Sequence, residues 1–460
     1  MNNLRLLLIS FLLASNFVFA QDLSQLKVQF VTLEKGEASP LKELAVEVKD
    51  QKVKWGHEIT LYPEIEYQVI EGIGGAFNEI GGEALLSLSK TQQDVVIDQL
   101  FSSDKAGFTF CRTAIGSSDF GLDAYSYSNK EGDYKMKEFS IERDQKYVLP
   151  YLKAAFKINP NLTLFASPWS PPAWMKINNS ITGLTEQENA LKADKKIYEA
   201  YARYFAKYLQ EYQNEGIFID RMCVQNENDA NTKYPSCVMP SSQMQELTTD
   251  HILPLFKKEQ ISTKVYAGTF RTAEKLDLIE LLTLEKVDQF EGVGIQYTSP
   301  FIITDAIKMK PQLKMFHTEG HCYNGKNSTE EAKHRLEEVA QYINSGVSNF
   351  CYWNMILNET TESGWEWPQN SLINIDRETK AIQYNPDYNA MYIISHFIKP
   401  GDVRIASNSQ KPMITVKDQD GNIKILIQNT DNNDSTFRIH LQGETKKITL
   451  PKQSITAIVI

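Results

Sequence analysis

Residues 194–227 read DKKIYEAYARYFAKYLQEYQNEGIFIDRMCVQNE, and this stretch decides the fold class. Its first part repeats apolar and aromatic residues at helical spacing between Ile197 and Tyr212, and Gly216 is a typical helix stop. An apolar run follows at once and closes with Glu227. A helix that leads directly into an apolar strand is the unit from which parallel βα sheets are built.

The same alternation of short apolar runs and helical patterns continues beyond this stretch. Residues 313–319, LKMFHTE, form a short predicted strand that closes with Glu319. Ser328 and Glu331 then have the spacing of a capping box, which predicts a helix from there to about Ile343. The sequence therefore repeats the βα unit well apart along the chain.

The βα-repeating region spans residues 68–398, and its length suits an eight-fold (β/α) barrel with insertions. A doubly wound open sheet is the alternative, but residues 73–75, IGG, lack the third glycine of a dinucleotide-binding turn. Residues 21–67, including a predicted strand at 44–48, and residues 399–460 alternate apolar and polar positions, which predicts half-buried β-strands. The predicted fold class is α/β, with a β-rich segment at each end.

The N-terminus resembles a leader. Residues 1–20 combine a short basic start, an apolar run and a small residue at Ala20, which is the pattern of a secretory signal peptide. The run is shorter than the roughly 20 residues that span a bilayer. A buried N-terminal helix is the alternative. We expect cleavage near Ala20 and a protein exported to a periplasm or to the extracellular space, monomeric and without stable membrane insertion.

The charge balance and the cysteines exclude several classes of protein. The 460 residues include 48 basic and 58 acidic ones, and the net charge is −10. Nucleic acid is not an expected partner, because binding phosphates requires a basic surface. The five cysteines include no Cys-x-x-Cys pair, so a zinc cluster or a disulfide scaffold is not expected. Buried core thiols are the favoured interpretation, and one disulfide, such as Cys237 to Cys322, stays open.

Glu227 and Glu319 stand where barrel strands are predicted to end. Active sites of (β/α) barrels lie at the carboxyl ends of the strands, so we expect the two side chains on different walls of one barrel mouth. Paired carboxylates across a sugar are the apparatus of glycoside hydrolysis, in which one gives a proton and the other attacks or activates water. Because the chain holds 58 acidic residues, chance placement is the alternative.

A metal site is a second alternative for this region, because His317 and His321 flank Glu319. Gly320 and the pattern around it argue against a metal-binding His-Glu-x-x-His helix. We therefore expect neither a metal nor another cofactor.

Aromatic and amide side chains accompany the two glutamates. Asn226 directly precedes Glu227, where its amide can hold a sugar hydroxyl beside the acid. Trp169 and Trp353 follow other apolar strands, and Trp365 lies in a later loop. Aromatic rings suit the C–H faces of sugars, although core packing is the alternative for any one of them. Together these positions favour a sugar cleft.

Arg112 and Asp119 follow another apolar run. A lone arginine at a strand end is more often part of a structural ion pair. It can also hold a neighbouring carboxylate ionised. Both residues are therefore candidates for the site.

Six motifs in this chain resemble glycoside hydrolase family 30, which includes glucosylceramidases and microbial endo-β-1,6-glucanases. They occur in the order of the family. The longest is highly specific. The motifs are residues 72–79 (GIGGAFNE), 112–121 (RTAIGSSDFG), 166–176 (ASPWSPPAWMK), 224–227 (VQNE), 317–319 (HTE) and 352–356 (YWNMI).

The resemblance implies a (β/α)8 TIM barrel over 68–398 with a side β-sandwich that both chain ends build. It implies Glu227 as the acid/base and Glu319 as the nucleophile of retaining hydrolysis, with carboxyl groups about 5–5.5 Å apart and a raised pKa at Glu227. It also implies a set of residues that line the sugar pocket. These are Arg112, Asp119, Trp169, Asn226 and Trp353.

Two departures bear on the substrate. Asn228 replaces the proline that commonly follows the Asn-Glu pair, and Gln296 and Tyr297 occupy the sixth strand where many members offer His and Tyr. A glutamine followed by an aromatic residue is similar to the endo-β-1,6-glucanase branch, as is the segment that begins at Trp365. Gln296, Tyr297 and Trp365 are therefore candidate substrate-binding residues.

We expect an exported retaining β-glycosidase whose substrate is a β-glucan, most simply β-1,6-glucan. An exo-β-glucosidase, a glucosylceramidase and a hydrolase of another β-glycan such as xylan are the alternatives within the class. A glycan-binding protein without turnover is the alternative outside it.

Overall fold

The computed structural model describes residues 23, 26–34, 36–45, 56–271 and 276–460. The predicted signal peptide over residues 1–20 lies outside the described residues, as does most of the predicted strand at 44–48. Within the described part of the chain, no helix is long and apolar enough to cross a membrane.

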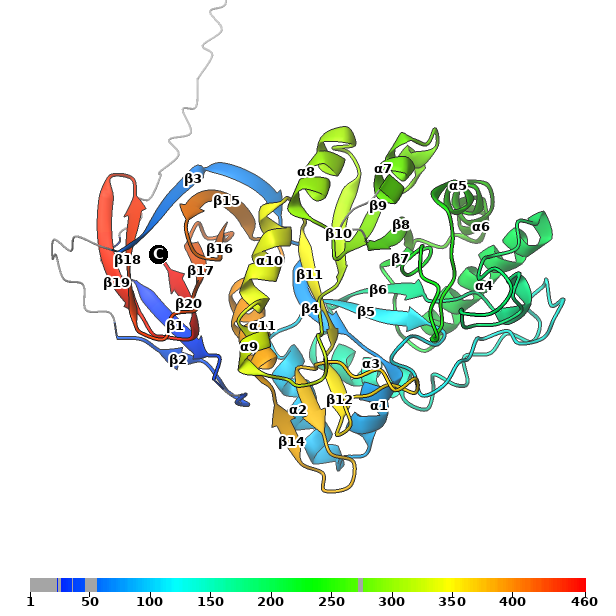
Figure 1. The fold of residues 1–460 in the computed structure, drawn as a ribbon, viewed down its shortest axis with the longest axis horizontal. Helices are drawn as coiled ribbons and strands as arrows, with labels where there is room; N and C mark the ends of the chain where they lie inside the picture. Colours follow the sequence, from blue (N-terminus) through cyan, green and yellow to red (C-terminus); the bar gives the residue numbers. More distant parts are fainter. Residues whose placement is uncertain (1–22, 24–25, 35, 46–55, 272–275) are drawn as a thin grey trace, which may run out of the picture.

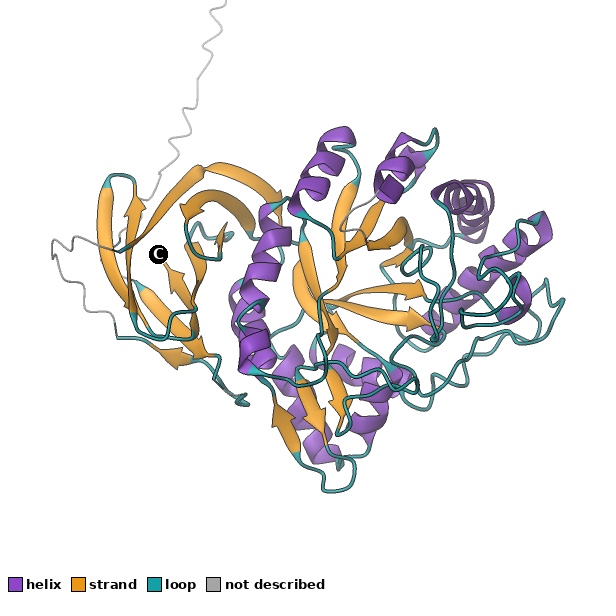
Figure 2. Ribbon diagram, in the orientation of Figure 1, coloured by secondary structure: helices purple, strands orange, loops and turns teal. Residues whose placement is uncertain are grey.

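Eight parallel strands of the described chain form the predicted barrel (Figures 1 and 2). They are hydrogen-bonded in the order β10-β9-β8-β7-β6-β5-β4-β11. Strands β4 to β10 therefore pair in the order of the sequence, and the first strand, β4, also pairs with the last, β11. This is the order of a (β/α)8 barrel, and the fold class is confirmed. The strands are β4 (Gly72–Ala76), β5 (Phe110–Ile115), β6 (Thr163–Pro168), β7 (Arg221–Cys223), β8 (Lys264–Arg271), β9 (Gly292–Gln296), β10 (Lys314–Glu319) and β11 (Asn349–Asn354).

Side chains close the seam between β10 and β11. The N–H of His317 donates to Asn349 Oδ1 at 2.9 Å, and Asn349 Nδ2 donates to the His317 carbonyl at 2.8 Å. The Cys351 N–H donates to His317 Nδ1 at 3.1 Å. Burial lowers the pKa of His317 to about 3, so the ring is neutral and accepts at Nδ1. His317 is therefore a structural residue of the seam.

Aromatic side chains fill the barrel interior. Phe165 and Phe316 pack edge to face at 5.1 Å, and Tyr266 lies 4.8 Å from Phe316. Phe110 adds a fourth ring 5.6 Å from Phe165. The guanidinium of Arg221 lies against three of these rings. The interior is a packed core rather than a pore.

Helices cover the outside of the barrel, and α4 (Lys195–Asn214) shows why they form (Figure 2). Asp194 caps its first turn, and its apolar and aromatic face is buried. The predicted helix and its stop at Gly216, whose φ is +82°, are confirmed. Other helices of the described chain are α1 (Glu79–Leu86), α2 (Lys90–Phe101), α3 (Val148–Ile158), α5 (Ser241–Glu246), a π-helical turn (Leu247–Ile252), α6 (Leu253–Glu259), α7 (Leu276–Thr283), α8 (Pro300–Met309), α9 (Thr329–Ala332), α10 (Arg335–Asn344) and α11 (Pro386–Phe397).

The two chain ends meet in one side domain, as predicted. Nine strands of the described chain form one continuous sheet in the order β19-β18-β3-β15-β16-β17-β20-β1-β2. The sheet curls around an apolar core, so its opposite halves face each other as the layers of a sandwich do (Figure 1). The strands are β1 (Lys27–Thr32), β2 (Lys42–Glu43), β3 (His57–Val69), β15 (Val403–Ser409), β16 (Met413–Lys417), β17 (Ile423–Asn429), β18 (Ser435–Leu441), β19 (Glu444–Leu450) and β20 (Ser454–Val459).

The helix predicted from Ser328 to about Ile343 is divided in two. The capping box of Ser328 and Glu331 is present, but α9 is short and α10 begins at Arg335. The carbonyl of Lys333 at the break accepts a hydrogen bond from Gln428 of the side sheet at 2.7 Å. A tertiary contact thus replaces the helical bond that the local pattern predicts.

The five cysteines all lie in the described part of the chain, where they are free and buried. The favoured interpretation as core residues is confirmed, and the disulfide between Cys237 and Cys322 is not formed. Burial raises the pKa of Cys322 to about 12 and that of Cys237 to about 11, so both thiols are protonated at neutral pH.

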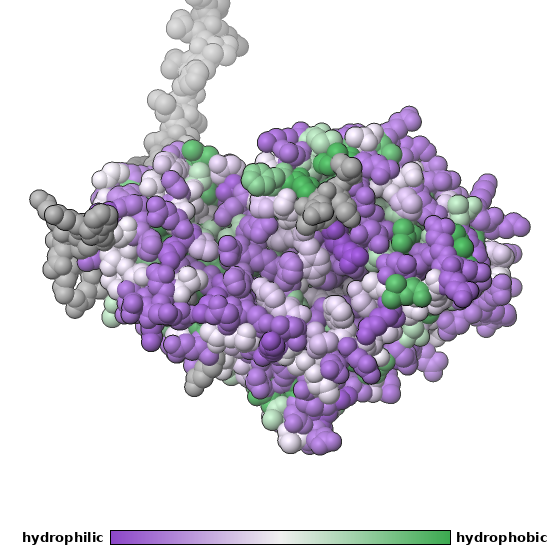
Figure 3. All heavy atoms as spheres, in the orientation of Figure 1, coloured by the Kyte–Doolittle hydropathy of each residue, from purple (hydrophilic) through white to green (hydrophobic). Residues whose placement is uncertain are grey.

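Hydrophilic side chains cover most of the face that Figure 3 shows, apart from the grey residues. Exposed hydrophobic side chains on the described surface include Phe301 on α8 and Leu184 in a loop, and Ile65, Tyr67 and Val69 follow one another along β3. Single exposed apolar residues are normal on protein surfaces.

The seam between β10 and β11 generates a stability prediction. We expect Asn349→Ala to lower the free energy of unfolding by about 2–4 kcal/mol, because it removes two buried hydrogen bonds and leaves the backbone of His317 unpaired. Urea unfolding measures the change. The control is Asn161→Ala in an exposed turn, and equal stability of the two variants would contradict the proposed closure.

Candidate active site

Glu227 lies just beyond β7, with a left-handed backbone φ of +43°. Its N–H donates to the Thr269 hydroxyl at 3.1 Å. Gln296 Nε2 lies 3.1 Å from one carboxyl oxygen, and Arg271 Nη1 lies 3.2 Å from the other. Side chains from β8 and β9, the next two strands, therefore hold the predicted acid at the barrel mouth.

The electrostatic surroundings of Glu227 favour its protonated form. Burial and the negative charge of Glu319 raise the pKa of Glu227 to about 7, and Arg271 opposes this rise. The predicted rise in pKa is thus present in the structure. A carboxyl group in this state can give a proton near neutral pH.

Glu319 ends β10 and receives two short hydrogen bonds. Arg112 Nη1 donates to one carboxyl oxygen at 2.7 Å, and the Tyr297 hydroxyl donates to the other at 2.6 Å. Donors of this kind stabilise negative charge on the carboxyl group. Tyr297 therefore reaches the predicted nucleophile, which the sequence did not settle.

Arg112 is fully buried and uses all of its donors. Its Nε and Nη2 donate to the Ser167 hydroxyl at 3.2 and 2.7 Å, and Nη2 also donates to Asn226 Oδ1 at 2.6 Å. Its Nη1 donates to the Thr318 carbonyl at 3.2 Å in addition to Glu319. The guanidinium thereby joins β5, β6, the segment after β7, and β10.

Asn226 has its amide oriented by two donors. Its Oδ1 accepts from Arg112 and, at 3.1 Å, from the Thr269 hydroxyl. Among the described residues, none accepts a hydrogen bond from its Nδ2. The amide N–H groups beside Glu227 are therefore available to a ligand, as the sequence predicted for this position.

Trp169 and Trp353 stack on each other with ring centres 5.1 Å apart and 25° between the planes. The Arg112 guanidinium lies 4.5 Å from the Trp169 ring and 5.3 Å from the Trp353 ring. Phe120, which follows Asp119, packs edge to face on Trp353 at 6.4 Å. The structure therefore brings the predicted tryptophans and the Asp119 segment together around Arg112.

Asp119 completes a group of three buried carboxyls. Burial and the charges of Glu319 and Glu227 raise its pKa well above the ordinary value. Among the described residues, Asp119 Oδ1 and Trp353 Nε1 have no hydrogen-bond partner. Buried polar atoms are almost always paired, so these two are suited to bind the hydroxyl groups of a ligand.

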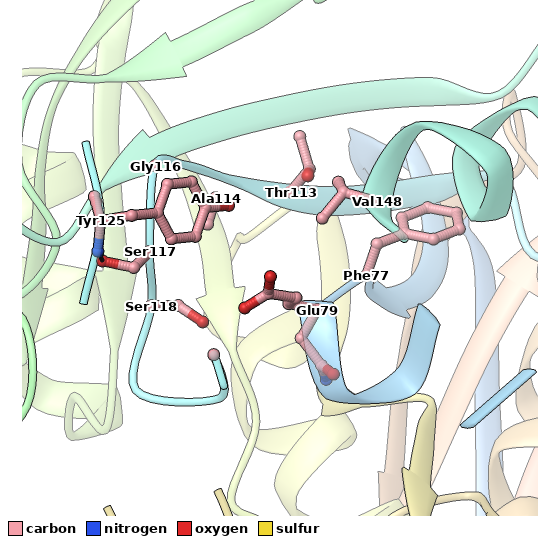
Figure 4. Close-up of a pocket in the computed structure, with 11 residues that line it drawn as sticks. Phe77, Glu79, Thr113, Ala114, Gly116, Ser117, Ser118, Tyr125 and Val148 are labelled. Carbon is pink, nitrogen blue, oxygen red and sulfur yellow. Dashed lines mark hydrogen bonds between the residues drawn. The ribbon is translucent and has the colours of Figure 1, made fainter. Parts of the chain in front are cut away.

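Glu79, a further carboxylate of the sequence motifs, anchors the segment that carries Asp119. It points from α1 into a small hollow beside Ser117 and Ser118 (Figure 4). It accepts the Leu122 N–H at 2.8 Å and pairs with Arg143 at 2.6 Å. Because both its oxygens are engaged, Glu79 has a structural role.

Trp365, a predicted substrate-binding residue, lies in the loop between β12 (Ile356–Asn358) and β13 (Ile373–Ile375). Strand β13 pairs with β14 (Ile382–Tyr384). The Trp365 N–H donates to Ser363 Oγ at 3.3 Å, and no contact among the described residues joins its ring to the two glutamates. Its neighbour Trp367 is 41% exposed and lies 6.2 Å from the Tyr234 ring.

Sequence reasoning missed four residues of the site. Arg271 and Thr269 lie at the end of β8, and Ser167 holds Arg112 from β6. Tyr234 lies near both glutamates, whose charges contribute to raising its pKa, although burial is the larger cause. Their positions at or after strand ends are the one signal that sequence offers, and it does not separate them from many other polar residues.

Comparison with known proteins agrees with this geometry. The profile of the glycosyl hydrolase family 30 TIM-barrel domain matches residues 70–258. Putative glucosylceramidase 3 of Caenorhabditis elegans is 27% identical over 370 residues, which are 75% of this chain and 70% of that protein. Endo-1,6-beta-D-glucanase BGN16.3 of Trichoderma harzianum is 34% identical over 215 residues, 45% of this chain and 44% of that protein.

Among solved structures, the endo-beta1,6-glucanase BT3312 superposes with a TM-score of 0.79 at 23% identity, covering 94% of this chain and 98% of that one. The barrel, the side sheet and the two buried glutamates fit the arrangement of a glycoside hydrolase. Over residues 70–258 the chain is therefore similar to glycoside hydrolase family 30.

The site electrostatics generate a prediction about Glu227. In Glu319→Gln the pKa of Glu227 should fall, because a neighbouring negative charge that disfavours its ionisation is removed. The pKa should stay above that of an exposed glutamate, because burial persists. Carbon-13 NMR of the labelled carboxyl groups measures it. The control is Glu330→Gln on the exposed surface, and an equal pKa of Glu227 in both variants would contradict the coupling.

Proposed function

We propose that the protein hydrolyses β-1,6-glucan by double displacement, with Glu319 as nucleophile and Glu227 as acid/base. One observation carries the assignment: two neighbouring buried carboxyls have opposite surroundings. Glu319 receives hydrogen bonds from the Arg112 guanidinium and the Tyr297 hydroxyl. Burial and the negative charge of Glu319 raise the pKa of Glu227 to about 7, so Glu227 stays largely protonated below that pH.

In the first step, Glu319 attacks the anomeric carbon of the sugar. The bond from this carbon to the glycosidic oxygen breaks, and that oxygen takes the proton of Glu227. The product is a glucosyl ester on Glu319 and a free alcohol on the leaving glucan. Asn226 stands beside the acid with free amide N–H groups, which suit the 2-hydroxyl of the reacting sugar.

In the second step, ionised Glu227 takes a proton from water, and the water oxygen attacks the anomeric carbon. The ester bond to Glu319 breaks and both glutamates return to their starting states. The sugar is released with its original anomeric configuration. Gln296 and Arg271 touch Glu227 in the structure, and they can hold its carboxyl group in both protonation states.

The β-1,6 linkage is the finer part of the proposal. Two relatives above 30% identity support it, the endo-1,6-beta-D-glucanases of Trichoderma harzianum and Neurospora crassa, at 34% and 31% over partial lengths. Gln296, which replaces the histidine of many members, is held by Thr318 at 2.8 Å and donates to Glu227. The leader predicted over residues 1–20 supports export.

A product-size assay tests the substrate. The protein is incubated with β-1,6-glucan, β-1,3-glucan, xylan and an aryl β-glucoside. We expect short β-1,6 oligosaccharides from the first and little release from the others, because the proposed site selects the β-1,6 linkage. Turnover of the aryl glucoside alone would refute the glucanase assignment and favour an exo-acting β-glucosidase.

The matched variant in this assay is Glu319→Gln. Because it lacks the nucleophile, its kcat on the best substrate should fall on the order of 10⁴-fold or more. Binding of that substrate should be largely retained, which also separates the enzyme from a glycan-binding protein without turnover.

A further inference from the structure

Tyr297 donates to Glu319 from a strained backbone position. It follows β9 with a left-handed φ of +51°, which is uncommon for a residue other than glycine. Its hydroxyl lies 2.6 Å from the Glu319 carboxyl group. Burial and the charges of Glu319 and Glu227 raise the pKa of Tyr297 well above its ordinary value, so the phenol keeps the proton that it donates. This hydrogen bond persists only while the ring keeps one orientation.

The main chain around Tyr297 is held by bonds that do not reach its ring. The Thr298 N–H donates to the Tyr342 hydroxyl at 3.0 Å. The Thr298 hydroxyl donates to the Gln296 carbonyl at 2.9 Å. Neither bond restrains the torsion angles of the Tyr297 side chain, so the orientation of the ring has to come from side-chain packing.

His321 packs against the ring of Tyr297. The two ring centres are 4.4 Å apart, and the planes are inclined by 56°. Among the ring contacts within the described part of the chain, this is the one that involves Tyr297. His321 follows the end of β10 at Glu319 by two residues. The side chain that supports the phenol therefore lies on the same segment as the carboxylate that accepts its proton.

Helix α10 holds His321 through both its backbone and its imidazole. Glu338 accepts the His321 N–H at 2.9 Å and lies 3.0 Å from Nδ1. The fully buried Arg335 pairs with Glu338 and donates to the His321 carbonyl at 2.7 Å. Burial acts to raise the pKa of Glu338, but the charge of Arg335 outweighs it and lowers this pKa to about 2. The carboxylate that anchors His321 is therefore ionised.

We propose that His321 is a positioning residue for the nucleophile: anchored on α10, its ring holds the Tyr297 hydroxyl against Glu319. This inference rests on the proposed function and deepens it, because it concerns how Glu319 is oriented for attack. It also gives the second histidine that flanks Glu319 a role without a metal. His321 acts through Tyr297 and not on the sugar.

A double-mutant cycle separates this role from a merely structural one. The side chain of His321 is about half exposed, so its loss leaves no closed cavity. We expect His321→Ala to lower the single-turnover rate at saturating substrate about 10-fold, with substrate affinity little changed, because a misplaced nucleophile slows attack and not binding. Tyr297→Phe removes the hydroxyl and should lower the rate by at least as much. Adding His321→Ala to Tyr297→Phe should then lower it no further.

The substrate is a β-1,6-linked gluco-oligosaccharide, or the aryl β-glucoside if the wild-type protein cleaves that alone. The cycle therefore remains informative if the proposed linkage is wrong.

Three further variants make the test specific. His321→Phe keeps a ring beside Tyr297 and should recover most of the rate. His321→Asn keeps a donor toward Glu338 without the ring, and should resemble His321→Ala. The control is His334→Ala, which removes an exposed histidine next to the start of α10 that makes none of these contacts, and it should leave the rate unchanged.

The possible failures are distinct. An unchanged rate in His321→Ala, independent losses in the cycle, or recovery by His321→Asn instead of His321→Phe would overturn the positioning role and leave the proposed function intact. A wild-type protein that cleaves no glycoside would refute the proposed function and this inference together.

Discussion

The buried guanidinium of Arg112 is the constraint on which the catalytic arrangement depends. A cation without access to water has to satisfy every donor inside the protein. Arg112 does so through Ser167, Asn226, the Thr318 carbonyl and Glu319, which belong to different parts of the barrel wall. These bonds fix the predicted nucleophile relative to the amide beside the predicted acid. Trp169 and Trp353 also pack against the Arg112 guanidinium, so this one side chain contacts both the proposed sugar pocket and the predicted nucleophile.

Strand β10 receives a second support on its other edge. Two residues before Glu319, the side chain of Asn349 binds both backbone groups of His317. A neutral imidazole then accepts the Cys351 N–H. The histidine that suggested a metal site from its spacing therefore closes the barrel. With the ladder to β9 on one edge and this seam on the other, Glu319 ends a strand that is held on both sides.

The periodicity of the sequence predicted the barrel and β-strands at both chain ends, and position at strand ends singled out the two glutamates. The resemblance to family 30 implied that both chain ends build one side domain. The sequence did not predict the division of α9 from α10, since the contact from Gln428 comes from a distant strand. It also missed Arg271, which ends β8 among many other polar residues, and Tyr234, which lies in the long segment between β7 and α5. Aromatic rings such as Phe165, Phe316 and Tyr266 pack inside the barrel, whereas Trp169 and Trp353 lie against Arg112.

In the proposed mechanism, Glu319 forms a covalent bond to the sugar while Glu227 transfers protons. Trapping with a 2-deoxy-2-fluoro-β-glucosyl reagent, followed by peptide mass spectrometry, tests it most directly, because the fluorine slows the second step more than the first. We expect one glucosyl group per protein, attached to Glu319. A label on Glu227 or on another residue, or continued turnover of the reagent by Glu319→Gln, would contradict it.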